Sequence, residues 1–339
     1  MAVGAGGRRV ASSVDELLAG ASDPEPLPHT DGKSGAHLAR VVIDGVPLVV
    51  KRLDLRSDWT MRAVGDLGCT TLTLWRSGFL DRLPGCFNQP IIAVAHEPAS
   101  RPGGYGTVLL MRDVGTAMVP EGDDPIPLAQ HRTFLAHLAE LSAAFWGFTD
   151  DLGLIPLANR YLELSPWTAE IETARPDPPF VPRLIGRGWR ALKALEPRAA
   201  GIVVPLFEDL DPLVDALATT PSTFVHGNWK LGNLGTDDEG RTVLIDWETP
   251  GAGPPCGELA WYLAINSARL PESKEATITA FRESLERAGV DTAPWWERQL
   301  AVSLLGGLVH FGWEKALGGD RDELGWWAEQ AEGGARYLG

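Results

Sequence analysis

Residues 223–234 read TFVHGNWKLGNL, and residues 244–248 read LIDWE. Residues 234–245, LGTDDEGRTVLI, connect the two stretches and predict a hairpin that turns at residues 237–240. Asn228 and Asn233 stand five positions apart in the first stretch, and Asp246 directly follows the apolar strand of the hairpin. Phosphoryl transfer needs oxygen ligands for Mg²⁺, a cation on the phosphates and an acceptor for the alcohol proton. The order loop, hairpin and Asp246 is typical of that chemistry.

The loop also has a plainer interpretation, in which residues 226–228 start a surface turn and Asp246 caps a helix. Matching motifs on both sides of a hairpin of the expected size favour the catalytic interpretation. In that interpretation His226, directly before Gly227, braces the loop in the way of histidine-first kinase loops. We therefore take His226 and Asn228 as the candidate catalytic residues.

The segments VHGNWKLGNLG and VLIDWETPGAGPPCGELAWYL resemble the aminoglycoside phosphotransferase and choline kinase superfamily. The strong match covers about forty residues. The usual pattern is H-G-D-x-x-x-x-N, then I-D-W/F-E/D, then D-L-A. The resemblance implies an α+β, two-lobed protein-kinase-like fold, an ATP–Mg²⁺ site between the lobes, and a small-molecule alcohol as acceptor. It places Asn233 and Asp246 on Mg²⁺ and Asn228 at the general-base position.

Two positions depart from the family pattern. Asn228 stands where the family has its base aspartate, and Glu258 stands where the family usually has aspartate. The second change is conservative and indicates a structural role, whereas the first removes the carboxylate expected to take the proton.

The chain before the loop divides into a part rich in predicted strands and a part that is mostly predicted helix. Residues 36–53 predict two strands joined at Asp44-Gly45, a strong hairpin pair. One helix over residues 57–78 and two more apolar strands follow, whereas residues beyond a Pro- and Asp-rich connector are mostly helical. We therefore expect a nucleotide-binding lobe with a small antiparallel sheet and one packed helix over residues 1–114. A larger helical lobe with the catalytic loop and acceptor site is expected over residues 115–339.

Lys51 ends the apolar strand VPLVVKRL and is the candidate for contacting the α- and β-phosphates. The plainer alternative is a solvated lysine at a strand end. No glutamate lies between Lys51 and Pro90, so its carboxylate partner is expected to be Asp66 in the middle of the helix, with Asp58 in reserve. The strand LLMRDVG is the expected linker, and Met111 to Val114 are the candidates for pairing with adenine.

Composition limits the partners. The 339-residue chain has no run of about 18 apolar residues, so we expect no membrane span. Its 45 acidic and 30 basic residues give a net charge of −15, which disfavours nucleic acid and anionic membranes and mildly favours a cationic acceptor. The net charge has a plainer explanation, which is that it keeps the protein in solution. Three cysteines without metal or disulfide spacing suggest a reducing cytoplasm. Nothing in the sequence indicates an oligomeric state.

Three functions stay open from the sequence. One is a small-molecule kinase impaired at Asn228, acting on an amino sugar, an aminoglycoside-like molecule or another alcohol. The second is a natural pseudokinase, an ATP-binding protein with a regulatory role or other chemistry. The third is a helical protein that binds no nucleotide. Tryptophans of the C-terminal half are expected mostly in the core, with Trp229 and Trp313 as candidates for an acceptor wall.

Overall fold

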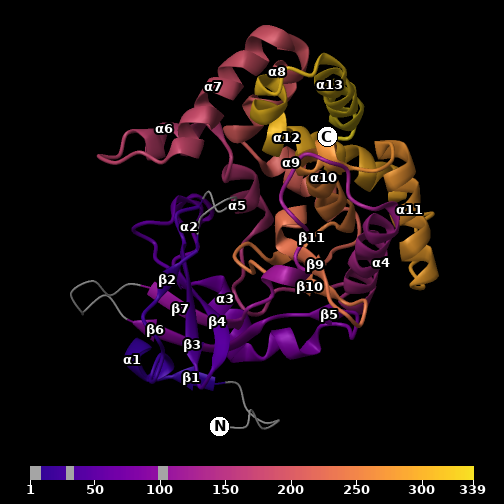
Figure 1. Cartoon of the computed structure of the whole chain (residues 1–339). Coiled ribbons are helices and arrows are strands. Elements are labelled where there is room, and N and C mark those ends of the chain that lie inside the picture. The colour runs from indigo at the N-terminus through magenta and orange to yellow at the C-terminus, as the bar shows by residue number, and fades with distance from the viewer. Residues whose placement is uncertain (1–8, 28–33, 98–105) are drawn as a thin grey trace. The chain divides into compact units, whose positions relative to one another are not determined.

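The computed structural model describes residues 9–27, 34–97 and 106–339 of the chain (Figure 1). These residues form two units. The first unit contains the chain up to Val119 together with Gly232–Glu248, and the second contains Pro120–Leu231 and Thr249–Gly339. A single boundary along the sequence therefore does not separate the units, because a short segment from the middle of the chain packs with the N-terminal part.

The first unit is built on a six-stranded sheet with the order β1-β6-β7-β4-β3-β2. Neighbouring strands are antiparallel, except that β1 pairs with β6 in parallel. The strands are β1 Arg9–Ala11, β2 Glu25–Pro26, β3 His37–Ile43, β4 Val46–Leu53, β6 Ile91–Glu97 and β7 Gly106–Arg112. The predicted hairpin joins β3 to β4, and both turn residues, Asp44 and Gly45, have positive φ (51° and 78°) as a two-residue turn requires.

The side chains of one face of the sheet form an apolar core with helix α1. Val41, Val50 and Leu110 pack there with Val14 and Leu17 of the short helix α1, Val14–Leu17. Lys51 follows Val50 on β4, and successive side chains of a strand point to opposite faces. The register pairs Lys51 with Leu38 on one side and Leu109 on the other. Lys51 therefore starts from the face opposite the α1 core.

The helix expected over residues 57–78 is in fact two helices, α2 Trp59–Val64 and α3 Thr70–Ser77. Gly65 ends α2 with a left-handed φ of 73°, where glycine has no Cβ to be strained. Asp66 therefore lies in the break between the helices, and the expectation of a mid-helix position was wrong. The 3₁₀ turns of the first unit are η1 Phe79–Arg82 and η2 Gly115–Ala117.

A second, three-stranded sheet explains why residues 232–248 belong to the first unit. Its order is β5-β10-β9, with β5 Phe87–Asn88, β9 Leu234–Thr236 and β10 Thr242–Leu244. The predicted hairpin is β9–β10, and β10 pairs in parallel with β5, Thr242 opposite Phe87. The side-chain amide of Asn88 also donates to Asp237 at 2.7 Å. Tertiary pairing thus fixes the hairpin that carries the motif.

The second unit is mainly helical. Its helices are α4 Leu128–Ala144, α5 Leu157–Leu162, α6 Pro166–Thr173, α7 Phe180–Leu195, α8 Pro197–Val203, α9 Asp211–Ala218, α10 Pro255–Ile265, α11 Lys274–Arg287, α12 Trp296–Leu317 and α13 Arg321–Ala335. Short elements complete it: the pair β8 Thr223–Val225 and β11 Gly251–Gly253, and the turns η3 Pro205–Phe207, η4 Leu231–Asn233 (shared with the first unit) and η5 Ser267–Arg269.

Helix α12 forms the centre of this unit, since it is buried along most of its length and packs against α7, α10 and α13 (Figure 1). The sequence prediction of an α+β fold with a small, mainly antiparallel sheet and a larger helical part is confirmed. Among the helices in the described ranges, none combines the length and the apolar character needed to cross a membrane.

Candidate active site

The loop that follows β8 is held in place by its glycine. Gly227 has a φ of +81°, and a Cβ there would lie only 2.1 Å from the carbonyl oxygen of Thr249. No other residue can occupy this position without moving the backbone. The close approach fixes the loop against the segment that follows the LIDWE motif.

Glu258 binds the backbone of the same loop. Its Oε2 accepts the N–H of Gly227 at 2.9 Å and its Oε1 accepts the N–H of Trp229 at 3.2 Å. Burial raises the pKa of Glu258 above its usual value, while these N–H groups and the nearby Arg160 act in the opposite direction. Glu258 also lies in the first turn of α10, where a carboxylate is favoured by the helix dipole. It therefore braces the loop.

His226 is the second brace. It is buried, and its Nδ1 lies 3.3 Å from the backbone N of Asn228, which donates to it. The ring of Trp229 meets His226 edge to face, and Trp229 is fully buried. Trp229 therefore packs the loop from inside and is not available as a wall for an acceptor. The side chain of Asn228 is half-buried in the second unit.

Asn233 and Asp246 lie at the open end of the β9–β10 hairpin. Leu234 pairs with Leu244 in the antiparallel register, and the N–H of Ile245 donates to the carbonyl of Asn233 at 3.2 Å. Asn233, which accepts this bond, and Asp246, which follows Ile245, are the two predicted metal ligands. Antiparallel pairing thus brings together side chains that are thirteen positions apart in sequence.

The backbone of Asp246 is strained. Its φ is +70°, in the left-handed region that costs a residue with a Cβ roughly 1–2 kcal/mol. Such conformations are maintained where the surroundings enforce them, and they cluster at functional sites. The conformation of Asp246 thus lowers the stability of the fold, while its carboxylate pairs with Lys51.

Lys51 forms ion pairs with two carboxylates of the first unit, Asp246 and Glu248. Burial lowers the pKa of Lys51, but the two carboxylates outweigh burial and raise the pKa above its ordinary value. Burial and the neighbouring Asp246 raise the pKa of Glu248 well above its usual range, against the effect of Lys51. Glu248 escaped the sequence analysis, although it is the last letter of the quoted LIDWE motif.

Asp66 does not pair with Lys51, so the expected partner is corrected. Its carboxylate accepts the backbone N–H of Thr70 at 2.8 Å and the Thr70 hydroxyl at 3.0 Å, which starts helix α3. Burial raises the pKa of Asp66 from 3.8 to about 6. The reserve candidate Asp58 caps α2 instead, accepting the N–H groups of Thr60 and Met61. Asp58 is therefore a helix cap, and Asp66 binds the first residue of the next helix.

A small cavity in the first unit collects several predicted residues. Lys51, Met111 and Asp246 line it, with further lining from Thr71, Pro90, Ile91, Leu109, Ile245 and Trp247. The Thr71 hydroxyl donates to the carbonyl of Trp247 at 2.6 Å, which ties α3 to the segment after Asp246. Val114 is not part of this lining and lies at the start of η2. One apolar wall and one charged wall therefore meet in this cavity.

The donor set fits Mg²⁺, which prefers oxygen ligands. Asp246 and Glu248 offer carboxylate oxygens, and Asn233 offers an amide oxygen, all within the first unit. Asp246 and Glu248 already bind one cation, the ammonium group of Lys51, so their surroundings stabilise positive charge. The set contains only oxygen donors, as Mg²⁺ prefers.

A family model described as "Phosphotransferase enzyme family" matches residues 109–293, more than half of the chain. A thermostable mutant of aminoglycoside phosphotransferase APH(4)-Ia, in a ternary complex with ADP and hygromycin B, is similar in fold at 15% identity and a TM-score of 0.51, covering 95% of this chain and 96% of that one.

A microcompartment-associated aminopropanol kinase is similar at 14% identity and a TM-score of 0.50, covering 92% of this chain and 90% of that one. The comparison with curated proteins gives no match. The two structural likenesses agree with the fold, and the match over residues 109–293 includes the loop, the hairpin and Glu258. The chain therefore belongs to the phosphotransferase enzyme family.

Proposed function

We propose that this protein is an ATP-dependent phosphotransferase that acts on a hydroxyl group of a small molecule. The observation that carries the proposal is the cluster of Lys51, Asp246 and Glu248 beside the cavity of the first unit. A buried lysine on a sheet strand with carboxylates that follow a hairpin is the equipment for holding a nucleotide triphosphate and its metal. The ADP-bound phosphotransferase of similar fold supports the same choice of nucleotide.

In this proposal residues 1–114 are the nucleotide-binding lobe and residues 115–339 carry the catalytic loop and the acceptor site. Lys51 contacts the α- and β-phosphates, and the backbone around Met111 and Val114 receives the adenine. Asn233 and Asp246 hold Mg²⁺, with Glu248 as an additional oxygen donor. When bound, Mg²⁺ neutralises phosphate charge, which is the main requirement of a loose transition state.

Asn228 determines the expected rate. Its amide oxygen can accept a hydrogen bond from the acceptor hydroxyl, so positioning is retained. An amide has no basicity adequate to take the proton, and general-base help is typically worth about 10²–10⁴-fold. His226 and Glu258 keep the backbone of this position fixed, so an aspartate introduced there would stand in the same place. We expect slow transfer by the chain as it stands.

The test compares the chain with its Asn228→Asp variant. ADP formation is measured with both proteins across amino sugars, aminoglycosides and simple alcohols, with Mg²⁺ present. We expect faster turnover by Asn228→Asp on at least one acceptor, with little change in nucleotide affinity. Asn228→Ala is the matched control, because it removes the amide without supplying a base. Equal rates for the Asp and Ala forms on every acceptor that binds would refute the impaired-kinase proposal.

The second candidate, a pseudokinase that binds ATP for regulation or other chemistry, is favoured by the same Asn228. A thermal-shift titration separates both from a protein that binds no nucleotide: ATP with Mg²⁺ raises the unfolding temperature only if the nucleotide site is real. Asp246→Ala serves as the control, since it removes a metal ligand. The acidic balance of the chain favours a cationic acceptor, and cysteine usage favours the cytoplasm.

A further inference from the structure

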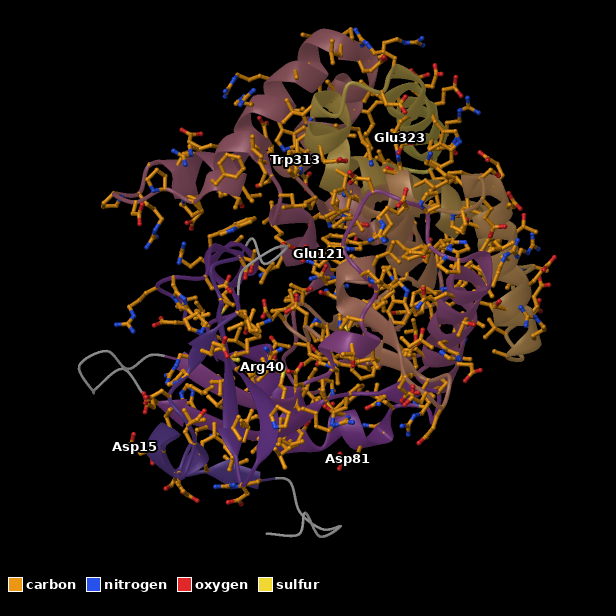
Figure 2. All side chains as sticks on the ribbon, in the orientation of Figure 1. Asp15, Arg40, Asp81, Glu121, Trp313 and Glu323 are labelled. Atoms are coloured by element: carbon orange, nitrogen blue, oxygen red, sulfur yellow. The ribbon has the colours of Figure 1, made fainter. Side chains whose placement is uncertain are left out.

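A groove runs between helices α6 and α7 of the second unit, and none of the candidate site residues described above lines it. Its volume is about 560 Å³, in the range of small-molecule sites. Four basic side chains of α7 line it: Arg183, Arg187, Arg190 and Lys193. One carboxylate, Glu170 of α6, also lines it. Figure 2 shows nitrogen-tipped side chains extending outward from α7.

The spacing of these residues places them on one face of the helix. Steps of four, three and three residues keep side chains in a single row, and all four are exposed. Among the residues that the structure describes, no ion pair involves any of the four. Like charges at this spacing repel one another, and Arg183 stands in the first turn, where the helix dipole disfavours a cation. Four cations thus line the groove against one carboxylate, Glu170, so the groove carries an excess of positive charge.

The opposite side of α7 is buried and packs against α12. A Cβ at Gly188 would lie 2.1 Å from the carbonyl oxygen of Trp313, so the backbones of α7 and α12 are in contact there. Gly186 faces the groove, and a Cβ there would meet Ala169 and Arg190 at an ordinary 3.7 Å. Gly186 thus keeps the floor of the groove open. Ala169 and two prolines, Pro166 and Pro182, add apolar surface to the lining.

We propose that this groove binds a small molecule that carries carboxylate or phosphate groups on a compact apolar body. Guanidinium groups pair with both anions in bidentate fashion, and three of them line the groove. The concave shape fits a small molecule, and the net charge of −15 opposes binding to nucleic acid or an anionic membrane. The groove shares no lining residue with the cavity beside Lys51, so this proposal does not depend on the proposed function.

The experiment titrates the full chain by isothermal calorimetry with citrate and, separately, with inorganic pyrophosphate. The double variant Arg187→Glu/Arg190→Glu reverses two charges of the row, and Gly186→Leu fills the floor. Each is expected to weaken anion binding roughly tenfold or more, because charge-assisted hydrogen bonds are lost or blocked. Arg198→Glu is the matched control, since Arg198 is an exposed arginine just beyond α7 that does not line the groove.

Binding of citrate alone assigns the site to carboxylates, and binding of pyrophosphate alone assigns it to phosphates. The proposal is overturned if neither anion binds at millimolar concentration, or if both groove variants bind as tightly as the control. It is also overturned if the chain binds only vesicles containing phosphatidylglycerol, because the row would then be a membrane contact. The ATP-dependent thermal shift of the same variants reports on the nucleotide site separately and is expected to stay unchanged.

Discussion

Glu258 and Gly227 are joined by a carboxylate-to-backbone hydrogen bond of 2.9 Å, and Glu258 is nearly inaccessible to solvent. At this position, where the family pattern predicts aspartate, the longer side chain of Glu258 supports the loop. A carboxylate that accepts two backbone N–H groups replaces the water those groups would otherwise bind. The geometry of the loop depends on a residue thirty positions further along the chain.

Replacing Glu258 by alanine is expected to leave the N–H groups of Gly227 and Trp229 buried without an acceptor. Each such loss costs about 1–3 kcal/mol, so the free energy of unfolding falls by roughly 2–5 kcal/mol. Glu258→Gln retains one acceptor oxygen, so its free energy of unfolding is expected to lie between those of the parent and the alanine variant. Urea unfolding measures both, with the exposed Glu329→Ala as control. An alanine variant as stable as the control would show that the bond does not support the loop.

Lys51→Met is expected to destabilise the protein by about 3–5 kcal/mol, since it leaves Asp246 and Glu248 buried without their cation. Adding Glu248→Gln in the same chain removes one of the uncompensated charges and should recover part of the loss. Arg40→Met is the control, because in the Arg40–Asp113 pair of the same unit the Arg40 side chain is 42% exposed, and an ion pair with an exposed partner is worth at most about 1 kcal/mol. Arg40 is labelled in Figure 2. Further destabilisation by Glu248→Gln would contradict this account.

Asp246→Gly and Asp246→Ala remove the same carboxylate but differ at a backbone φ of +70°. Glycine adopts this conformation without strain, so the glycine variant is expected to be about 1–2 kcal/mol more stable than the alanine variant. Both are expected to lose Mg²⁺-dependent nucleotide binding. Denaturant unfolding gives the first comparison and nucleotide titration the second. Two variants of equal stability would mean that the backbone relaxes when the carboxylate is gone.

Asp66 should give the stability a distinctive pH dependence. Its pKa is raised by burial from 3.8 to about 6, so between these values the folded state binds more protons than the unfolded state. The free energy of unfolding therefore falls as pH rises from about 4 to about 6, by up to about 3 kcal/mol from this group. Asp66→Asn has no proton to release and is expected to lack this part of the fall.

The measurement for Asp66 is urea unfolding at several pH values between 4 and 6, taking the difference between the two proteins. Asp15→Asn, at an exposed position of α1 in the same unit, is the control and is expected to follow the parent curve (Figure 2). Parallel curves for Asp66→Asn and the parent would show that the carboxyl group ionises in the fold as it does in the unfolded chain.

Local patterns predicted much of the fold and part of the site. The residue pair Asp44-Gly45 alone predicts a two-residue turn, and the structure has the β3–β4 hairpin there. The apolar run VPLVVKRL placed Lys51 on a strand, and the structure brings Lys51 to Asp246. These features depend on neighbours in sequence or on one short motif, so the sequence contains the information for them.

What the sequence did not reveal depends on contacts across the chain. Glu248 is an ordinary acidic residue until tertiary packing places it against Lys51, 197 positions earlier. The break at Gly65 was obscured because apolar periodicity continues on both sides of it. The parallel pairing of β10 with β5 has no local signature at all. Each of these is an effect of distant partners on segments whose own preferences are weak.

The split composition of the first unit also determines when it can form. Its three-stranded sheet cannot be completed until residues 232–248 have been synthesised, more than a hundred residues after Val119. At about 5–20 residues per second, that delay is on the order of 10 s on the ribosome. During this interval Lys51 lacks both carboxylates and β5 lacks the strand that pairs with it. The first unit therefore stays incomplete during synthesis until residues 232–248 have left the exit tunnel.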